Sequence, residues 1–164
     1  VAAANIIPAA VTARYMVRSP TIEGLAALRP RVEACFEAGA LATGCGVAYH
    51  ELSPVYSHME ADPALLAAYR ANAETLGRTF EADDAGTPRP TLSTDMANVS
   101  LAVPTIHPLI GIETNGAVNH QREFAAACIT ESADAAVRDG AVALAWTAID
   151  AATDPALRNR LLSG

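Results

Sequence analysis

Four histidines are the side chains of this sequence best suited to carry out chemistry, but their spacing matches no known catalytic motif. They stand at positions 50, 58, 107 and 120, and the sequence contains no HExxH, no GxSxG and no glycine-rich phosphate loop. His120 lies between a predicted buried strand and a predicted helix, a position typical of a cleft. A neutral imidazole there is able to bind zinc, and the alternative is a hydrogen-bonded loop histidine. His50 and His58 lie in a predicted strand and at its exit, where we expect surface or sheet roles.

Asp95, His107 and Arg18 are the other polar residues of interest, and each also has a purely structural explanation. Asp95 is either a cleft carboxylate or, as the local sequence favours, the N-cap of a short helix. His107 lies between an isoleucine and a proline, where a packed and hydrogen-bonded histidine is the more common role. Arg18 ends a predicted strand on its polar face. Its guanidinium suits bidentate capture of a carboxylate, although a solvated arginine is the default.

The elements that must position these residues begin with a strand, a helix and a second strand. Apolar and polar residues alternate over 11–18 and again over 46–59, which predicts two strands. Between them, apolar residues recur at helical spacing from an N-cap at Thr21 to a stop at Gly44, with Pro30 expected to kink or split the helix. This order is typical of an α/β fold in which a helix covers one face of a sheet.

The second half of the sequence is predicted to be mainly helical. Asp62 and Pro63 form a strong helix start, and the stretch 109–112 is typical of a buried strand. Three further helices are predicted over 123–129, 132–153 and 155–162. We place the boundary between a smaller first lobe and a larger second lobe at the acidic turn near residue 60.

The composition excludes several classes of partner. The 164 residues include 11 basic and 18 acidic side chains, all the basic ones being arginine, for a net charge of −7. Because phosphate binding needs clustered basic residues, we expect neither nucleic acid nor an anionic membrane surface as a partner. No apolar run approaches the roughly 20 residues of a membrane span. The first four residues lack the features of a signal peptide.

Three cysteines, at positions 35, 45 and 128, complete the inventory of reactive side chains. An odd number without a CxxC pair argues against a disulfide framework and against a zinc finger. We therefore expect three small buried thiols in a reducing compartment, and a cytoplasmic protein.

Three stretches of the second half resemble a known enzyme family. They read Ser-Thr-Asp-Met-Ala-Asn-Val-Ser from position 93, Val-Pro-Thr-Ile-His-Pro from position 103 and His-Gln-Arg-Glu-Phe from position 120. Together they resemble the zinc aminoacylase and carboxypeptidase-G metallopeptidases, peptidase family M-twenty. The branch that includes aminobenzoyl-glutamate hydrolase and a β-alanyl-lysine-type dipeptidase is the most similar. The segments 5–8, 11–18 and 33–44 resemble that family's lid domain.

This resemblance implies an architecture. Family members have a catalytic α/β domain with a two-zinc site and an inserted ferredoxin-like lid that also dimerises. Residues 1–60 would then be the last part of the lid, and residues 61–164 the C-terminal part of the catalytic domain. The implied fold class is α/β, an α+β lid segment joined to part of a catalytic α/β domain, with the family fold incomplete. The implied assembly is a homodimer through the lid.

The resemblance also implies roles for individual residues. His120 matches the family's last metal ligand, Asn5 and Arg18 match the lid residues that hold the substrate's carboxylate, and Asp95 and His107 match positions near the cleft. The HxD motif, the bridging Asp and the Glu-Glu pair of the family lie upstream of the lid, so no catalytic residue is expected in this chain. One imidazole does not make a catalytic zinc site, which needs three protein ligands. We therefore expect this chain alone to bind no zinc and to be inert.

The function implied is that of a C-terminal fragment of a zinc-dependent amidohydrolase or dipeptidase. In the whole enzyme a zinc-bound hydroxide, with a glutamate as general base, would hydrolyse the amide bond of a small N-acyl amino acid or dipeptide. One alternative is a non-catalytic module of the lid type, acting in oligomerisation or small-molecule binding. A third possibility is an enzyme with an unrelated site around Asp95, His107 and His120.

Overall fold

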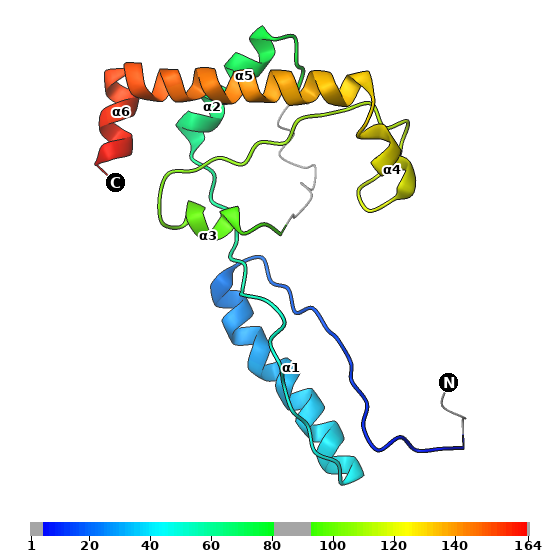
Figure 1. Ribbon diagram of the computed structural model, residues 1–164. Helices are drawn as coiled ribbons and strands as arrows, with labels where there is room; N and C mark the ends of the chain where they lie inside the picture. Colours follow the sequence, from blue (N-terminus) through cyan, green and yellow to red (C-terminus); the bar gives the residue numbers. More distant parts are fainter. Residues whose placement is uncertain (1–4, 81–92, 164) are drawn as a thin grey trace. The chain divides into compact units, whose positions relative to one another are not determined.

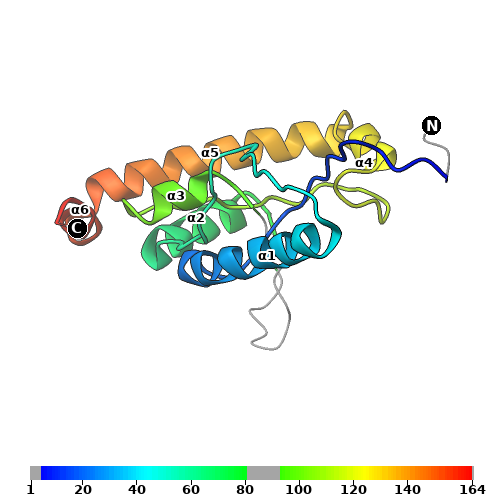
Figure 2. The ribbon, with the colours of Figure 1, turned by 90° about the horizontal axis from the view of Figure 1, so that it is seen from below.

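The structure, a computed structural model, describes residues 5–80 and 93–163 and has six helices within those ranges (Figures 1 and 2). The chain divides into two compact units, Val1–His58 and Met59–Gly164. The first unit holds α1 (Ile22–Thr43). The second holds α2 (Pro63–Thr75), α3 (Met96–Ser100), α4 (Arg122–Ala127), α5 (Glu131–Thr153) and α6 (Pro155–Leu162). The lid and catalytic identities predicted for residues 1–60 and 61–164 stay predictions.

Helix α1 begins and ends where the local sequence predicts. The Thr21 hydroxyl accepts a hydrogen bond from the backbone N–H of Gly24 over 3.1 Å, which satisfies one unpaired donor of the first turn. At the other end Gly44 has a φ of 68°, and the N–H of Cys45 donates to the Ala40 carbonyl over 2.9 Å. Pro30 lies inside the helix without splitting it, although it removes one intrahelical hydrogen bond.

Two non-helical segments run along α1, one on each side of it in the sequence. The Tyr15 ring lies 4.9 Å from the Phe36 ring, centroid to centroid, and the Tyr49 hydroxyl donates to the Glu33 carbonyl over 2.8 Å. Each segment thus touches α1 through one tyrosine, although Tyr15 and Tyr49 stay 68% and 44% exposed. Within residues 5–58, however, neither segment pairs with a neighbouring strand, so the strands predicted over 11–18 and 46–59 are wrong for the described structure.

The second unit is organised around the packing of α2 against α5, with α6 against the end of α5. Its central cluster is Tyr69, Ala73 and Ala143, and Leu76, Phe80 and Ile106 pack around it. Small side chains let the two helices approach closely, but they remove little apolar surface from water. Helices were correctly predicted here, since α2 begins at the expected Pro63 and α4, α5 and α6 agree with the expected ranges to within about two residues.

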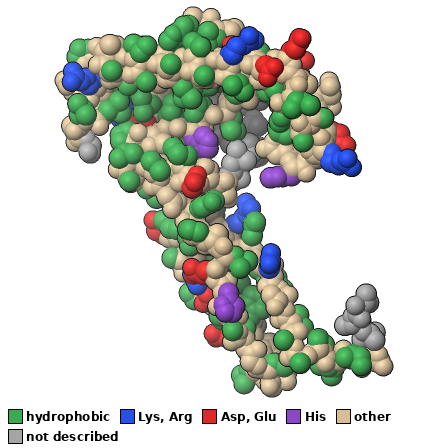
Figure 3. Space-filling view, in the orientation of Figure 1, with side chains coloured by type: hydrophobic (Ala, Val, Ile, Leu, Met, Phe, Trp, Pro, Cys, Tyr) green, Lys and Arg blue, Asp and Glu red, His purple; other side chains and the backbone are tan. Residues whose placement is uncertain are grey.

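Much of the apolar surface of the second unit is uncovered. Along α5 the side chains of Val137, Trp146 and Ile149 are 72%, 37% and 57% exposed. Figure 3 shows hydrophobic side chains spread along α5 on the face in view.

The three cysteines are also exposed, so the prediction of buried thiols is wrong. Among the described residues, the buried apolar side chains are one tyrosine and six alanines, which make no large core for the thiols to pack into.

Residues 105–114 form an extended segment that follows α5 toward α4 in both ribbon views (Figures 1 and 2). Its even-numbered residues from 106 to 114 are half-buried, and its odd-numbered residues from 107 to 113 are exposed. This alternation is that of a strand with one covered face. The segment has no paired neighbour among the described residues, and Leu109 is 61% exposed. The buried strand predicted over 109–112 is therefore wrong, and the described part of the chain is helical rather than α/β.

Candidate functional site

His120 lies in the loop between the extended segment and α4, and the loop begins with a tight turn. Asn115 and Gly116 both have positive φ, 50° and 85°, and the N–H of Ala117 donates to the Thr114 carbonyl over 3.0 Å. These values fit a type I′ turn, for which Asn-Gly is a preferred pair. The turn sets the direction in which the chain leaves the extended segment.

A second turn holds His120 itself. The N–H of Gln121 donates to the Val118 carbonyl over 3.3 Å, and the Gln121 side-chain oxygen accepts from the N–H of Val118 over 3.0 Å. His120 occupies the third position of this turn with a φ of 70°. A positive φ is uncommon outside glycine, although histidine is among the residues that tolerate it best. Two hydrogen bonds between one pair of residues thus fix the backbone that carries an exposed imidazole.

An open groove of about 880 Å³ lies beside these turns. Glu113, Thr114, Gln121 and Glu123 supply polar groups to its wall, and Ala126 and Ala127 are among its apolar lining residues. Two carboxylates with no basic side chain among the described lining residues give the groove a negative character. His120 does not line it, but its neighbour Gln121 does.

Asp95 and His107 make fewer contacts with the rest of the fold than the local sequence predicts. Asp95 occupies the N-cap position of α3, but its side chain makes no cap hydrogen bond, and the Thr94 hydroxyl accepts from the N–H of Met96 instead, over 3.3 Å. His107 is exposed on the outer face of the extended segment, so the expectation of a packed histidine is wrong. Across residues 5–80 and 93–163, no hydrogen bond or ion pair joins Asp95, His107 and His120.

The two residues predicted to hold a carboxylate both lie in the first unit. Asn5 and Arg18 are exposed, and no hydrogen bond between them is present in the described structure. The Arg18 guanidinium lies 3.4 Å from the Met16 sulfur, on the face of the segment opposite Tyr15 and its ring contact with α1. Of the remaining histidines, His50 is exposed, and His58 Nδ1 accepts from the N–H of Ile22 at the start of α1 over 3.3 Å, a structural role.

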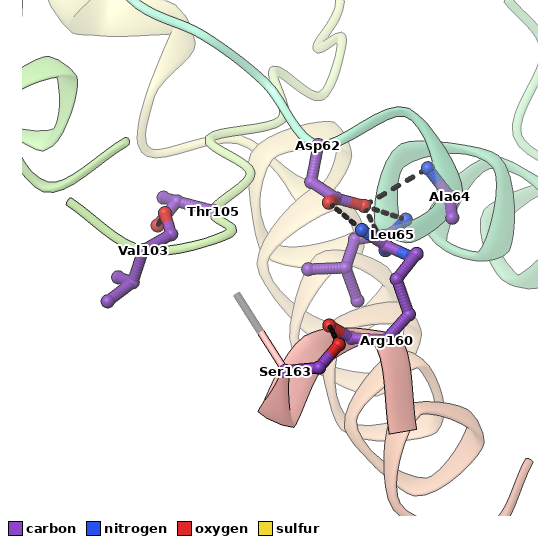
Figure 4. Close-up of polar contacts among 7 residues, drawn as sticks. All are labelled: Asp62, Ala64, Leu65, Val103, Thr105, Arg160 and Ser163. Atoms are coloured by element: carbon purple, nitrogen blue, oxygen red, sulfur yellow. Dashed lines mark hydrogen bonds and ion pairs between the residues drawn. The ribbon is translucent and has the colours of Figure 1, made fainter. Parts of the chain in front are cut away.

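An ion pair of the second unit joins Asp62 and Arg160 (Figure 4). Both guanidinium terminal nitrogens donate to the carboxylate over 2.7 Å, in a bidentate arrangement. The same carboxylate caps α2 by accepting from the N–H groups of Ala64 and Leu65 over 3.1 and 2.9 Å. The bonds from Arg160 lower the pKa of the Asp62 carboxyl, and the two backbone bonds act in the same direction against its burial. The sequence indicated the cap, but it gave no indication of a partner 98 positions away.

The described residues do not form a metal site by themselves. No group of three or more His, Cys, Asp or Glu side chains lies close enough to hold an ion within residues 5–80 and 93–163. An exposed imidazole such as His120 is a donor of the type that zinc uses, but a catalytic zinc ion takes three protein ligands. The residues present therefore fit at most one position of such a site.

The sequence is similar to two curated dipeptidases. It is 39% identical over 153 residues to the Xaa-Arg dipeptidase of Mus musculus, and 37% identical over the same length to that of Homo sapiens. Each match covers 93% of this chain and 35% of the relative. The chain thus spans about a third of the length of these relatives. No family model matches the sequence, and no solved structure matches it. Within the described ranges, no helix is long and apolar enough to cross a membrane.

Proposed function

We propose that this chain is the C-terminal portion of a zinc-dependent dipeptidase of the M-twenty metallopeptidase type. The observation that carries the proposal is the identity of 37–39% to the Xaa-Arg dipeptidases over 93% of the chain. The name of these relatives supports, as the substrate class, dipeptides whose C-terminal residue is arginine, within the broader class of small N-acyl amino acids and dipeptides. No observation favours the non-catalytic module over this function.

His120 is proposed to supply one ligand of the metal site. Its exposure and its fixed turn support the role, because a ligand must reach the ion without a large rearrangement. The other ligands and the general base would come from parts of the enzyme that this chain does not span. The described residues hold no further ligand set, so we derive no catalytic step through the metal.

Asn5 and Arg18 are proposed to bind the substrate's carboxylate. The guanidinium of Arg18 supplies paired donors in a fixed plane, and the Asn5 amide adds a further donor. Both side chains are exposed, which supports the role because a substrate must reach them. Asp95 and His107 stay candidate cleft residues with no assigned role.

The remaining proposals concern assembly and location. We propose that residues 1–60 belong to a lid domain that forms a homodimer, and that residues 61–164 belong to the catalytic domain. A cytoplasmic location is proposed from the cysteine usage alone.

The test is a chimera in which this chain replaces the aligned 153 residues of the mouse dipeptidase. In the chimera, His120→Ala is expected to reduce hydrolysis of a dipeptide ending in arginine by at least about a hundredfold, because even the loss of a group that only orients a metal ligand typically costs about 10–100-fold. His50→Ala is the matched control, since that histidine is exposed in the first unit and carries no proposed role. Equal activity of the two variants in folded protein contradicts the role of His120.

A further inference from the structure

The stretch of chain that carries His120 leaves and rejoins the fold at one place, the start of α5. On the way in, the N–H of Glu113 donates to the hydroxyl of the half-buried Ser132 over 2.9 Å. On the way out, α4 leads to Thr130, the N-cap of α5. Figures 1 and 2 show α4 and this loop at the same end of α5. Both ends of the stretch 113–130 are therefore held on one helix.

Two hydrogen-bonded turns, back to back, fill the path from Glu113 to His120. The first spans residues 114–117 and the second spans residues 118–121. Each turn fixes φ and ψ of its two central residues, so little backbone freedom is left between the two ends of the path. The place of His120 therefore follows from where the Ser132 hydroxyl holds Glu113.

A second anchor holds the extended segment two residues before Glu113. Arg78, which follows the end of α2, donates from Nη1 to the Gly111 carbonyl over 3.2 Å. Its Nε and Nη2 both lie close to Asp139 Oδ2 of α5, at 2.8 and 2.7 Å. The side chains of Arg78 and Asp139 are 20% and 30% exposed, and charge-assisted bonds of partly buried groups are screened less than those at the surface. The carboxylate thus orients the guanidinium that holds Gly111.

We propose that Ser132 and Arg78 are positioning residues that hold the His120 loop against α5 for metal binding. The inference rests on the proposed function, in which His120 is a metal ligand, and adds the residues through which this chain presents it. A functional side chain has to be held within about 0.5 Å of its productive position by the groups that support it. A 23-residue helix is a rigid frame for that purpose, and both anchors are fixed to it.

Amide hydrogen exchange of the chain tests the anchors without any metal. In Ser132→Ala and in Arg78→Ala, the N–H groups of Ala117 and Gln121, which close the two turns, are expected to exchange at least about fivefold faster. The N–H of Ala143, which is fully buried in α5, is the reference and should change much less. Equal acceleration at the turns and at Ala143 is a general loss of stability and overturns the proposal. Unchanged exchange at the turns overturns it as well.

The chimera with the mouse dipeptidase tests the link to the metal. Ser132→Ala and Arg78→Ala are expected to raise the Kd for zinc at least about tenfold and to lower kcat more than they raise KM. Arg78→Lys keeps the charge but loses the planar fork, so it should recover only part of the zinc affinity. Asp62→Asn weakens the ion pair between α2 and α6 instead, and it is the control for lost stability. It should keep the zinc Kd of the unmodified chimera.

The outcomes in the chimera separate the two proposals. A folded, unmodified chimera that neither binds zinc nor hydrolyses the dipeptide rejects the proposed function, and with it the metal role of the anchors. An active chimera whose zinc Kd is unchanged by Ser132→Ala and Arg78→Ala overturns the positioning inference alone. Equal weakening of zinc binding by Asp62→Asn overturns it too, because the effect then follows from stability and not from the loop.

Discussion

The Asp62–Arg160 pair gives the most quantitative prediction for the fold. The Asp62 side chain is 7% exposed, and it joins the start of α2 to α6 through a cap and a bidentate ion pair. Loss of an N-cap costs about 1 kcal/mol, and an ion pair with one exposed partner adds up to about 1 kcal/mol more. Arg160 is 45% exposed, so solvent screens its charge. Asp62→Ala is therefore expected to destabilise the second unit by about 2 kcal/mol.

Asp62→Asn is the matched variant because its amide oxygen still caps α2 while the negative charge is gone. It is expected to lose about half as much stability as Asp62→Ala. For a unit of roughly 100 residues these losses correspond to Tm decreases of about 5 °C for the amide and about 10–15 °C for alanine. The assay is thermal unfolding of the chain by circular dichroism, with amide exchange at Ala64 and Leu65 reporting on the cap.

A double-mutant cycle tests whether Asp62 and Arg160 stabilise the fold as a pair. Because Arg160 has its partner in Asp62, Arg160→Ala should add little further loss to Asp62→Ala. Strict additivity of the two changes, or equal stability of Asp62→Asn and Asp62→Ala, would refute the reasoning from geometry.

The same pair predicts a pH dependence of known sign. The pKa of Asp62 is lowered in the folded state, so the stabilisation is present above the ordinary aspartate pKa of about 3.9 and is lost as the pH falls through the lower folded value. Stability measured between pH 7 and pH 3 should therefore fall more steeply in the unmodified chain than in Asp62→Asn. Parallel pH profiles of the two proteins contradict this assignment.

Three further predictions test the loop, the metal and the carboxylate clamp. Gly116→Ala should destabilise the second unit by about 1 kcal/mol because φ is 85° at that position. Gly111→Ala is the control, since a methyl group there meets open space and φ is not positive. Equal melting temperatures of the two variants would reject the turn. The isolated chain should bind zinc no more tightly than a surface histidine does, and calorimetry that finds a submicromolar site removed by His120→Ala would contradict this. In an active chimera, Arg18→Ala should lower kcat/KM at least about tenfold for a dipeptide with a free carboxylate and leave kcat/KM for its amide analogue nearly unchanged. Arg18→Lys should restore only part of kcat/KM for the free acid. Equal losses on both substrates would remove Arg18 from the site.

Helix ends were predictable because their chemistry is local. The hydroxyl of Thr21 and the carboxylates of Asp62 and Asp154 each cap a helix that begins at the next residue, and Gly44 ends α1 in the left-handed conformation. Each of these interactions joins residues within five positions of one another. Strands failed for the opposite reason, since a strand needs a partner that local alternation does not reveal.

The candidate site was predictable only in part. Asn-Gly is a preferred pair for the tight turn at residue 115, but the turn that holds His120 depends on a hydrogen bond that the N–H of Val118 donates to the Gln121 side chain. The carboxylates of Glu113 and Glu123 line one groove because a loop folds back between them. Their proximity follows from the path of the loop and not from their spacing. The roles of Asn5 and Arg18 stay predictions.

The central claim, that this chain is part of a dipeptidase, is tested most directly by restoring activity. The mouse dipeptidase lacking its aligned 153 residues is expected to be inactive, and insertion of this chain at that position should restore hydrolysis of a dipeptide ending in arginine. The measurement is kcat/KM of the chimera beside that of the deleted protein. A ratio of at least about a hundred agrees with the account, and a chimera that melts cooperatively yet hydrolyses no faster than the deleted protein contradicts it.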